Sequence, residues 1–259
     1  MEISIVTAAL GAIVLAYMSC WYVLARLTGR LDVVDSAWGL GFVLVAWASL
    51  AITQNVSVVT LGSAVLASLW GLRLFAHIAN RNWRKHTDDH RYIELQKNWG
   101  KQANRKAFTN VFLLQGALLL TVSTPLVTIA VKAGDSLNVG MWIGWGIWLF
   151  GILFEATADY QLARFIKNRP AGSHAIMNTG LWRYSRHPNY FGEVTTWWGA
   201  GMVALSLGGW WGLVGPVVIT LLITKISGIP PLEKHYADNA EYQTYAKKTS
   251  ILVPLPPKP

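Results

Sequence analysis

The chain begins, after Met1 and Glu2, with the uncharged run ISIVTAALGAIVLAYMSCWYVLA at residues 3–25. A helix rises about 1.5 Å per residue, so a run of this length can cross the roughly 30 Å hydrocarbon layer of a bilayer. No basic segment precedes the run and no small-residue cleavage site follows it, so we expect a retained helix rather than a signal peptide. This stretch predicts an integral membrane protein.

Further apolar runs of similar length follow along the 259 residues. With the first, the runs cover residues 3–25, 34–53, 56–79, 108–131, 139–160, 190–207 and 211–226. Only 14% of the residues are charged, against about 25% in soluble domains, while 53% are hydrophobic. The sequence therefore predicts an all-α fold, a polytopic membrane bundle of seven transmembrane helices that forms a single membrane domain over residues 1–259.

The basic residues indicate how this bundle is oriented. Of the 22 Lys and Arg, 20 lie in the connections after the first, third and fifth runs or toward the C-terminal tail. Because cytoplasmic connections carry an excess of Lys and Arg, we expect the N-terminus outside, the C-terminus in the cytoplasm and an odd number of helices. Topology thus accounts for the net charge of +9, and we expect no nucleic-acid partner.

Several ionisable residues lie inside the apolar runs, where a charge is costly unless it faces a cavity or a partner. Asp35, Arg73, Asp159 and Glu193 occupy a similar depth near the cytoplasmic ends of their helices. We expect them to line a shared polar chamber, although Arg73 and Asp159 could instead reach the membrane interface. No metal site is expected, because the pair His86 and His90 lacks a further Cys or His.

The segment NTGLWRYSRHPNYFGE at residues 178–193 is the most informative part of the sequence. Arg183, Arg186 and His187 precede Pro188, which is a typical first residue of a helix. The N-terminus of a helix, with its free N–H groups and flanking arginines, favours phosphate oxygens. The segment therefore predicts an anion site on the cytoplasmic side.

This segment resembles the C-terminal signature of the steroid 5α-reductase superfamily, which also includes sterol reductases and isoprenylcysteine carboxyl methyltransferases. The likeness extends over residues 139–254 and includes Glu233, Tyr242 and Tyr245 in the tail. Gly192 followed by Glu193 is similar to the reductase branch, whereas the methyltransferases usually carry an aromatic residue after this glycine. The resemblance implies an oxidoreductase with NADPH as its cofactor.

The resemblance also implies roles for individual residues. Residues 139–259 would form the cofactor side and residues 1–131 the substrate side. The residues implied in NADPH binding are Arg81, Asp159, Arg164, Arg169, Arg183, Tyr184, Arg186, His187, Asn189 and Glu193. Those implied in substrate binding are Asp35, Ser36, Trp38, Trp70 and Arg73, with Glu193 and Asp35 expected to be catalytic.

The implied reaction is the reduction of a C=C bond conjugated to a carbonyl, with a 3-oxo-Δ4 steroid as the expected substrate. The partners would be this hydrophobic small molecule, entering from the lipid side, and membrane lipid. Two alternatives stay open: an S-adenosylmethionine-dependent methyltransferase acting on a lipid or prenylated substrate, and a non-catalytic sterol- or lipid-binding membrane protein. We expect a bacterial inner membrane, with the endoplasmic reticulum as the other candidate.

Overall fold

The computed structural model describes residues 2–83, 87–170, 173 and 175–258. Within these residues the secondary structure is helical, and the one β-type feature is an isolated bridge between Ser185 and Ser250. The all-α prediction is therefore confirmed for the described part of the chain. His86, which was considered as a metal ligand, lies outside the described residues.

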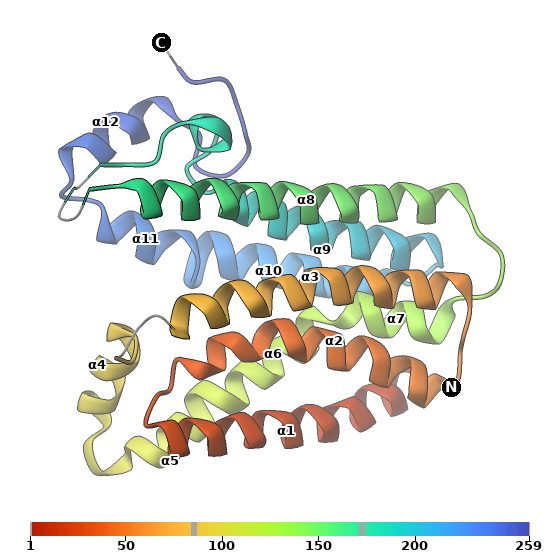
Figure 1. Cartoon of the computed structure of the whole chain (residues 1–259). Coiled ribbons are helices and arrows are strands. Elements are labelled where there is room, and N and C mark those ends of the chain that lie inside the picture. Colours follow the sequence, from red (N-terminus) through yellow and green to blue (C-terminus); the bar gives the residue numbers. More distant parts are fainter. Residues whose placement is uncertain (1, 84–86, 171–172, 174, 259) are drawn as a thin grey trace. The chain divides into compact units, whose positions relative to one another are not determined.

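The helices occupy most of the chain and are coloured in sequence order in Figure 1. Their bounds are α1 Ile3–Thr28, α2 Val33–Thr53, α3 Val58–Trp83, α4 His90–Trp99, α5 Ala103–Ala107, α6 Leu114–Val122, α7 Thr124–Lys132, α8 Val139–Asn168, α9 Pro188–Ser206, α10 Val214–Leu221, α11 Ile229–His235 and α12 Ala240–Lys248. A π-helical segment, Phe108–Leu113, joins α5 to α6, and a second, Leu222–Ile226, precedes α11.

Five helices among the described residues are long and apolar enough to cross a membrane: Ile3–Thr28, Val33–Thr53, Val58–Asn82, Val139–Asn168 and Trp210–His235. A sixth candidate is the pair His90–Val122 and Thr124–Lys132, which meet at a bend of 45°. The protein is therefore an integral membrane protein with five or six candidate spans. The predicted run at 190–207 does form helix α9, but this helix is not among the candidates, so the seven-span topology stays a prediction.

The chain divides into two compact units. Unit 1 comprises residues 1–141 and 204–215, and unit 2 comprises residues 142–203 and 216–259.

In unit 1 two glycines let α2 and α3 approach closely. A Cβ atom built on Gly39 would lie 2.2 Å from the carbonyl oxygen of Gly71, and one on Gly71 would lie 2.5 Å from that of Gly39. Figure 1 shows these helices side by side. Small residues that allow backbones to touch are typical of helix pairs in membranes. Trp70 and Phe42 pack beside this contact with ring centroids 5.4 Å apart.

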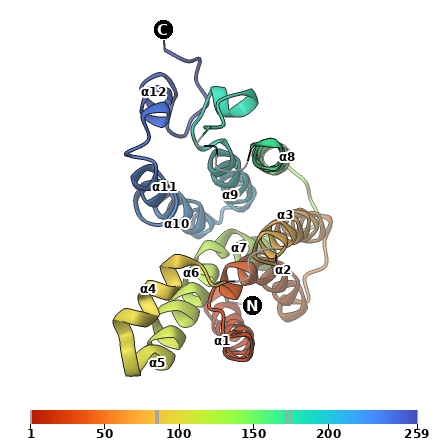
Figure 2. The same cartoon turned by 60° about the vertical axis from the view of Figure 1, so that its left-hand side comes forward.

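In unit 2, glycines likewise let α8 and α9 approach closely. A Cβ atom on Gly199 would lie 2.4 Å from the backbone nitrogen of Trp148, and one on Gly192 would lie 2.6 Å from that of Glu155. The indole of Trp198 donates a hydrogen bond to Thr220 across to α10, at 3.1 Å. Figure 2 shows α8, α9 and α10 as neighbours. The first residues of α9 are thereby fixed against the C-terminal half of α8.

Candidate functional site

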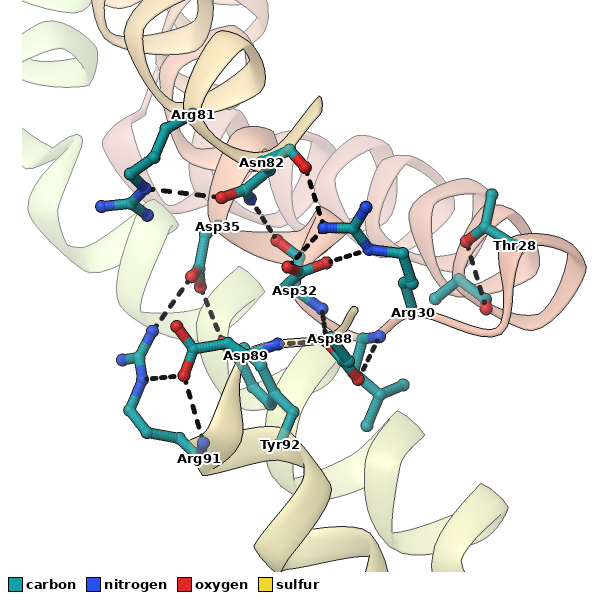
Figure 3. A network of polar contacts seen from close by, with 12 residues as sticks. Thr28, Arg30, Asp32, Asp35, Arg81, Asn82, Asp88, Asp89, Arg91 and Tyr92 are labelled. Atoms are coloured by element: carbon teal, nitrogen blue, oxygen red, sulfur yellow. Dashed lines mark hydrogen bonds and ion pairs between the residues drawn. The ribbon is translucent and has the colours of Figure 1, made fainter. Parts of the chain in front are cut away.

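In unit 1, Asp35 is held by two side chains of α4 (Figure 3). The phenol of Tyr92 donates to Oδ1 of Asp35 at 2.7 Å, and the guanidinium of Arg91 lies 3.2 Å from Oδ2. The Asp35 side chain is 18% exposed. A carboxylate in the first turn of a membrane helix therefore has both oxygens engaged by donors from another element.

The loop between α1 and α2 fixes α4 in this position. The carboxylate of Asp88 accepts hydrogen bonds from the backbone N–H groups of Leu31 and Asp32, at 3.0 and 2.9 Å. The next residue, Asp89, is the N-cap of α4 and accepts from the N–H group of Arg91 at 3.1 Å. Such caps satisfy free N–H groups at the start of a helix. The register of α4 thus brings Arg91 and Tyr92 to Asp35.

The buried carboxylate of Asp32 holds Arg30 in the same loop. Two nitrogens of Arg30 donate to Asp32 at 3.0 and 2.7 Å, and this hydrogen-bonded partner raises the pKa of Arg30. Arg30 also donates to the backbone oxygen of Asn82 at the end of α3, at 3.0 Å. Figure 3 shows these contacts beside those of Asp35. The ends of α1, α2, α3 and α4 are therefore joined by one polar network.

A hydrogen-bonded chain continues from Asp35 into the helices of unit 1. The amide of Gln115 on α6 donates to the Tyr92 hydroxyl at 3.4 Å and accepts from the indole of Trp38 at 2.6 Å. Sequence reasoning did not select Tyr92, which is the buried residue of α4. The signal that could have found Tyr92 is an aromatic residue inside a short, polar, amphipathic helix. Two acidic residues come directly before that helix.

The other residues expected on the substrate side have different environments. Trp70 is 1% exposed and packs against Phe42, with ring centroids 5.4 Å apart. Ser36 is also buried, and Arg73 is partly buried. Arg81, which was expected to bind the cofactor, belongs to unit 1, where its Nε lies 3.4 Å from the side-chain oxygen of Asn82.

In unit 2 a cavity of about 660 Å³ lies along the C-terminal end of α8, and Pro170, Ala175, Met177, Thr179 and Gly180 line it beyond that helix. Arg164 and Arg169, both exposed, line it together with Tyr160 and Gln161. Gly180 closes one side with a φ of +60°, and a Cβ atom there would lie 2.6 Å from the amide oxygen of Gln161. That oxygen accepts the N–H of Leu181 at 2.9 Å. The glycine therefore lets the loop approach α8 and form the wall of a basic groove.

Elsewhere in unit 2, α8 and α9 bring Asp159 and Asn189 together. The amide nitrogen of Asn189 lies 3.2 Å from Oδ1 of Asp159, which is 8% exposed. Glu193 follows Asn189 by one turn of α9 and is partly buried. Gly192, immediately before Glu193, is the glycine that packs on Glu155. Asn189 and Gly192 thus lie on the face of α9 that packs against α8, and Glu193 directly follows Gly192.

Arg186 and His187 have partners within unit 2. A guanidinium nitrogen of Arg186 lies 3.2 Å from Glu233, and His187 Nε2 lies 2.8 Å from the other oxygen of that carboxylate. Burial lowers the pKa of His187 below its usual range, against the opposing effect of Glu233. Arg183 and Tyr184, by contrast, are exposed. The four residues predicted as one cofactor group therefore fall into a solvent-facing pair and an internally bonded pair.

The chamber predicted from membrane depth combined residues that belong to different units. Asp35 and Arg73 lie in unit 1, whereas Asp159 and Glu193 lie in unit 2. Within unit 2, Asp159 contacts Asn189, which lies one turn before Glu193 on α9. The shared chamber therefore stays a prediction.

Comparison with known proteins places the chain in a family. Residues 21–249 match the family described as "Protein of unknown function (DUF1295)". The chain belongs to this family. 3-oxo-5-alpha-steroid 4-dehydrogenases and an isoprenylcysteine methyltransferase are among the curated proteins that match the chain, so the predicted superfamily is confirmed.

Curated relatives of this DUF1295 protein come from two branches of the superfamily. The chain is 29% identical over 127 residues to the 3-oxo-5-alpha-steroid 4-dehydrogenase 1 of Bos taurus, covering 49% of this chain and 46% of the relative. It is 30% identical over 113 residues to the Macaca fascicularis protein of the same name, covering 44% and 40%. It is 27% identical over 106 residues to the Saccharomyces cerevisiae Protein-S-isoprenylcysteine O-methyltransferase, covering 38% and 41%. The chain thus spans less than half the length of these relatives.

Proposed function

We propose that this protein is an NADPH-dependent membrane oxidoreductase that reduces a C=C bond conjugated to a carbonyl in a hydrophobic substrate. A 3-oxo-Δ4 steroid is the substrate class that the dehydrogenase relatives favour. The observation that carries the proposal is the basic groove of unit 2, and the Asp159–Asn189 contact of the same unit supplies hydrogen-bonding groups. An NADPH-binding site needs both features, cations for phosphates and hydrogen-bonding groups for the ribose and the carboxamide.

The groove fits a dinucleotide in size and in chemistry. Its volume of about 660 Å³ lies within the range of roughly 300–1,000 Å³ usual for small-molecule sites. Arg164 and Arg169 line it, and Arg183 lies three residues beyond its Gly180. Guanidinium groups bind phosphate oxygens in a bidentate manner. In this proposal these three arginines bind the phosphates, and Tyr184 is a further exposed contact.

Asp159, Asn189 and Glu193 serve the remaining polar groups of the cofactor. Asp159 binds a ribose or adenine group, while Asn189 and Glu193 orient the nicotinamide carboxamide. NADPH, when bound, supplies a hydride to the β-carbon of the enone. Glu193 orients the carboxamide in this proposal. It is charged and lies one turn after Asn189, so the two side chains together set the direction in which the carboxamide points.

The carbonyl end of the substrate needs hydrogen-bond donors of its own in this proposal. Negative charge develops on the carbonyl oxygen as the β-carbon gains a hydride, and donors directed at that oxygen lower the barrier. The apolar helices exclude water, which strengthens each of these interactions. Membrane lipid is the medium from which such a substrate would arrive.

A binding titration separates this proposal from its alternatives. Purified full-length protein in detergent is titrated separately with NADPH and with S-adenosylmethionine by calorimetry. The proposal predicts saturable binding of NADPH alone. Binding of S-adenosylmethionine alone would instead favour the methyltransferase, in line with the yeast relative, and binding of neither would favour a lipid-binding protein without catalysis.

A further inference from the structure

The carboxylate of Glu233 on α11 joins three side chains of unit 2. Its Oε1 accepts a hydrogen bond from the phenol of Tyr242 at 2.5 Å and lies 2.8 Å from His187 Nε2, while Oε2 pairs with Arg186 at 3.2 Å. A carboxylate only accepts hydrogen bonds, so His187 carries its proton on Nε2. The side chains of Arg186 and His187 are 12% and 5% exposed, which distinguishes this cluster from a solvated surface ion pair.

The backbone of the C-terminal tail holds the same segment from another direction. The N–H of Arg186 donates to the carbonyl of Ser250 at 2.8 Å, and the hydroxyl of Ser185 donates to that of Leu252 at 2.7 Å. The N–H of Leu255 donates to the carbonyl of Tyr184 at 3.0 Å. Residues 184–187 are therefore clamped between the tail backbone and the Glu233 carboxylate.

The clamped segment separates two groups assigned to the cofactor. Arg183 lies just before it and is exposed, and Asn189 lies two residues after it, on Asp159. Neither group is itself held by the tail through a described side-chain contact. Their positions depend on the conformation of the backbone between them, which Arg186 and His187 fix from inside the protein.

We propose that Glu233 is a positioning residue of the cofactor site: through Arg186 and His187 it holds the turn that sets Asn189 on Asp159 and directs it toward the nicotinamide end of the dinucleotide. This inference rests on the proposed function. It changes the roles expected for Arg186 and His187, which here act by anchoring the turn rather than by contacting phosphate. The basic groove on α8 does not depend on this anchor.

The test compares a whole cofactor with a fragment that lacks nicotinamide. Dissociation constants of NADPH and of adenosine 2′,5′-bisphosphate are measured on the full-length protein carrying Glu233→Gln or Tyr242→Phe. We expect NADPH to bind about tenfold more weakly to Glu233→Gln, which removes the charge that pairs with Arg186 and His187, and a fewfold more weakly to Tyr242→Phe, which leaves both of those contacts in place. The bisphosphate should lose clearly less affinity than NADPH does, because Arg164 and Arg169, two of its three arginines, lie on the groove.

Matched controls come from the same tail. Asp238→Asn removes an exposed carboxylate, and Tyr236→Phe removes the hydroxyl of a ring that stacks on Tyr242 at 5.1 Å. Both should leave the two dissociation constants unchanged. Thermal stability of every variant is measured in parallel, and Tyr242→Phe keeps the test informative if Glu233→Gln does not fold.

Two results would overturn the inference alone. One is unchanged NADPH affinity in both variants, and the other is an equal loss of NADPH and bisphosphate, which a general loss of structure would produce. A wild-type protein that binds neither ligand would instead refute the proposed function, and this inference with it.

Discussion

Arg183 offers the most direct residue-level test of the phosphate assignment, because it is exposed next to the basic groove. Replacing it by Ala removes a charge-assisted contact worth about 1.5–3 kcal/mol. The NADPH dissociation constant should rise roughly tenfold to more than a hundredfold. If Arg183 binds the 2′-phosphate, NADH affinity should barely change. Lys247→Ala, an exposed basic residue of α12, is the control; an unchanged NADPH dissociation constant in Arg183→Ala would refute the assignment.

The lowered pKa of His187 predicts a pH dependence of stability. In the unfolded chain this imidazole takes up a proton near pH 6.5, whereas in the folded protein burial delays protonation to lower pH. The unfolded state therefore binds more protons as the pH falls below about 6.5, and the free energy of unfolding decreases until the pH reaches the folded pKa. Thermal unfolding between pH 7.5 and 5.5 measures this effect. His187→Gln should show a flatter pH profile than wild type, and identical slopes would contradict the prediction.

At the scale of elements, the α2–α3 contact predicts which glycine the fold needs. Gly39→Ala would place a methyl group about 2.2 Å from the backbone oxygen of Gly71, where neither helix can yield without separating. Gly146→Ala on α8 meets no atom within 4 Å and should be tolerated. We expect Gly39→Ala to lower the yield of folded protein and the unfolding temperature by several degrees. Equal stability of the two variants in detergent would show that the helices do not pack this closely.

The long helices could be predicted from the sequence, because an uncharged run of more than about 20 residues has one stable form in lipid. The short amphipathic helix α4 could not, since it lies within a polar, basic connection and owes its position to its N-cap Asp89 and to the contact of Asp88 with the α1–α2 loop. The sequence pattern also identified the start of α9. It did not show that α9 carries too many small and polar residues to rank with the five candidate spans.

The sequence could select candidate site residues only where a motif or its resemblance to a family points to them. Asn189 and Asp159 were selected from the segment and its resemblance, and the structure joins them at 3.2 Å. Arg186 and His187 were selected with them, but their partner Glu233 comes from a helix 46 residues beyond His187, and no local pattern shows that contact. Trp70 was expected beside the substrate; it is buried in unit 1, and its substrate role stays a prediction.

At the scale of the whole molecule, the number of spans decides on which side the termini lie. Seven spans require opposite sides, whereas the five long helices with the bent pair would give six and place both termini on one side. The distribution of Lys and Arg favours a cytoplasmic C-terminus. A reporter that fluoresces only in the cytoplasm, fused after Pro259, should therefore be bright. An N-terminal fusion of the same reporter should be dark, and equal brightness at both ends would contradict seven spans.

The central claim is that this protein transfers a hydride from NADPH to a conjugated C=C bond. The decisive measurement is turnover of a 3-oxo-Δ4 steroid by the purified full-length protein in lipid nanodiscs, with NADPH consumption and reduced product quantified together. We predict equal amounts of both, and a decrease of at least tenfold in turnover for a folded Glu193→Gln variant, equivalent to about 1.4 kcal/mol of transition-state stabilisation. NADPH binding without any reduced product across a panel of steroid and lipid enones, or wild-type turnover in Glu193→Gln, would contradict the account.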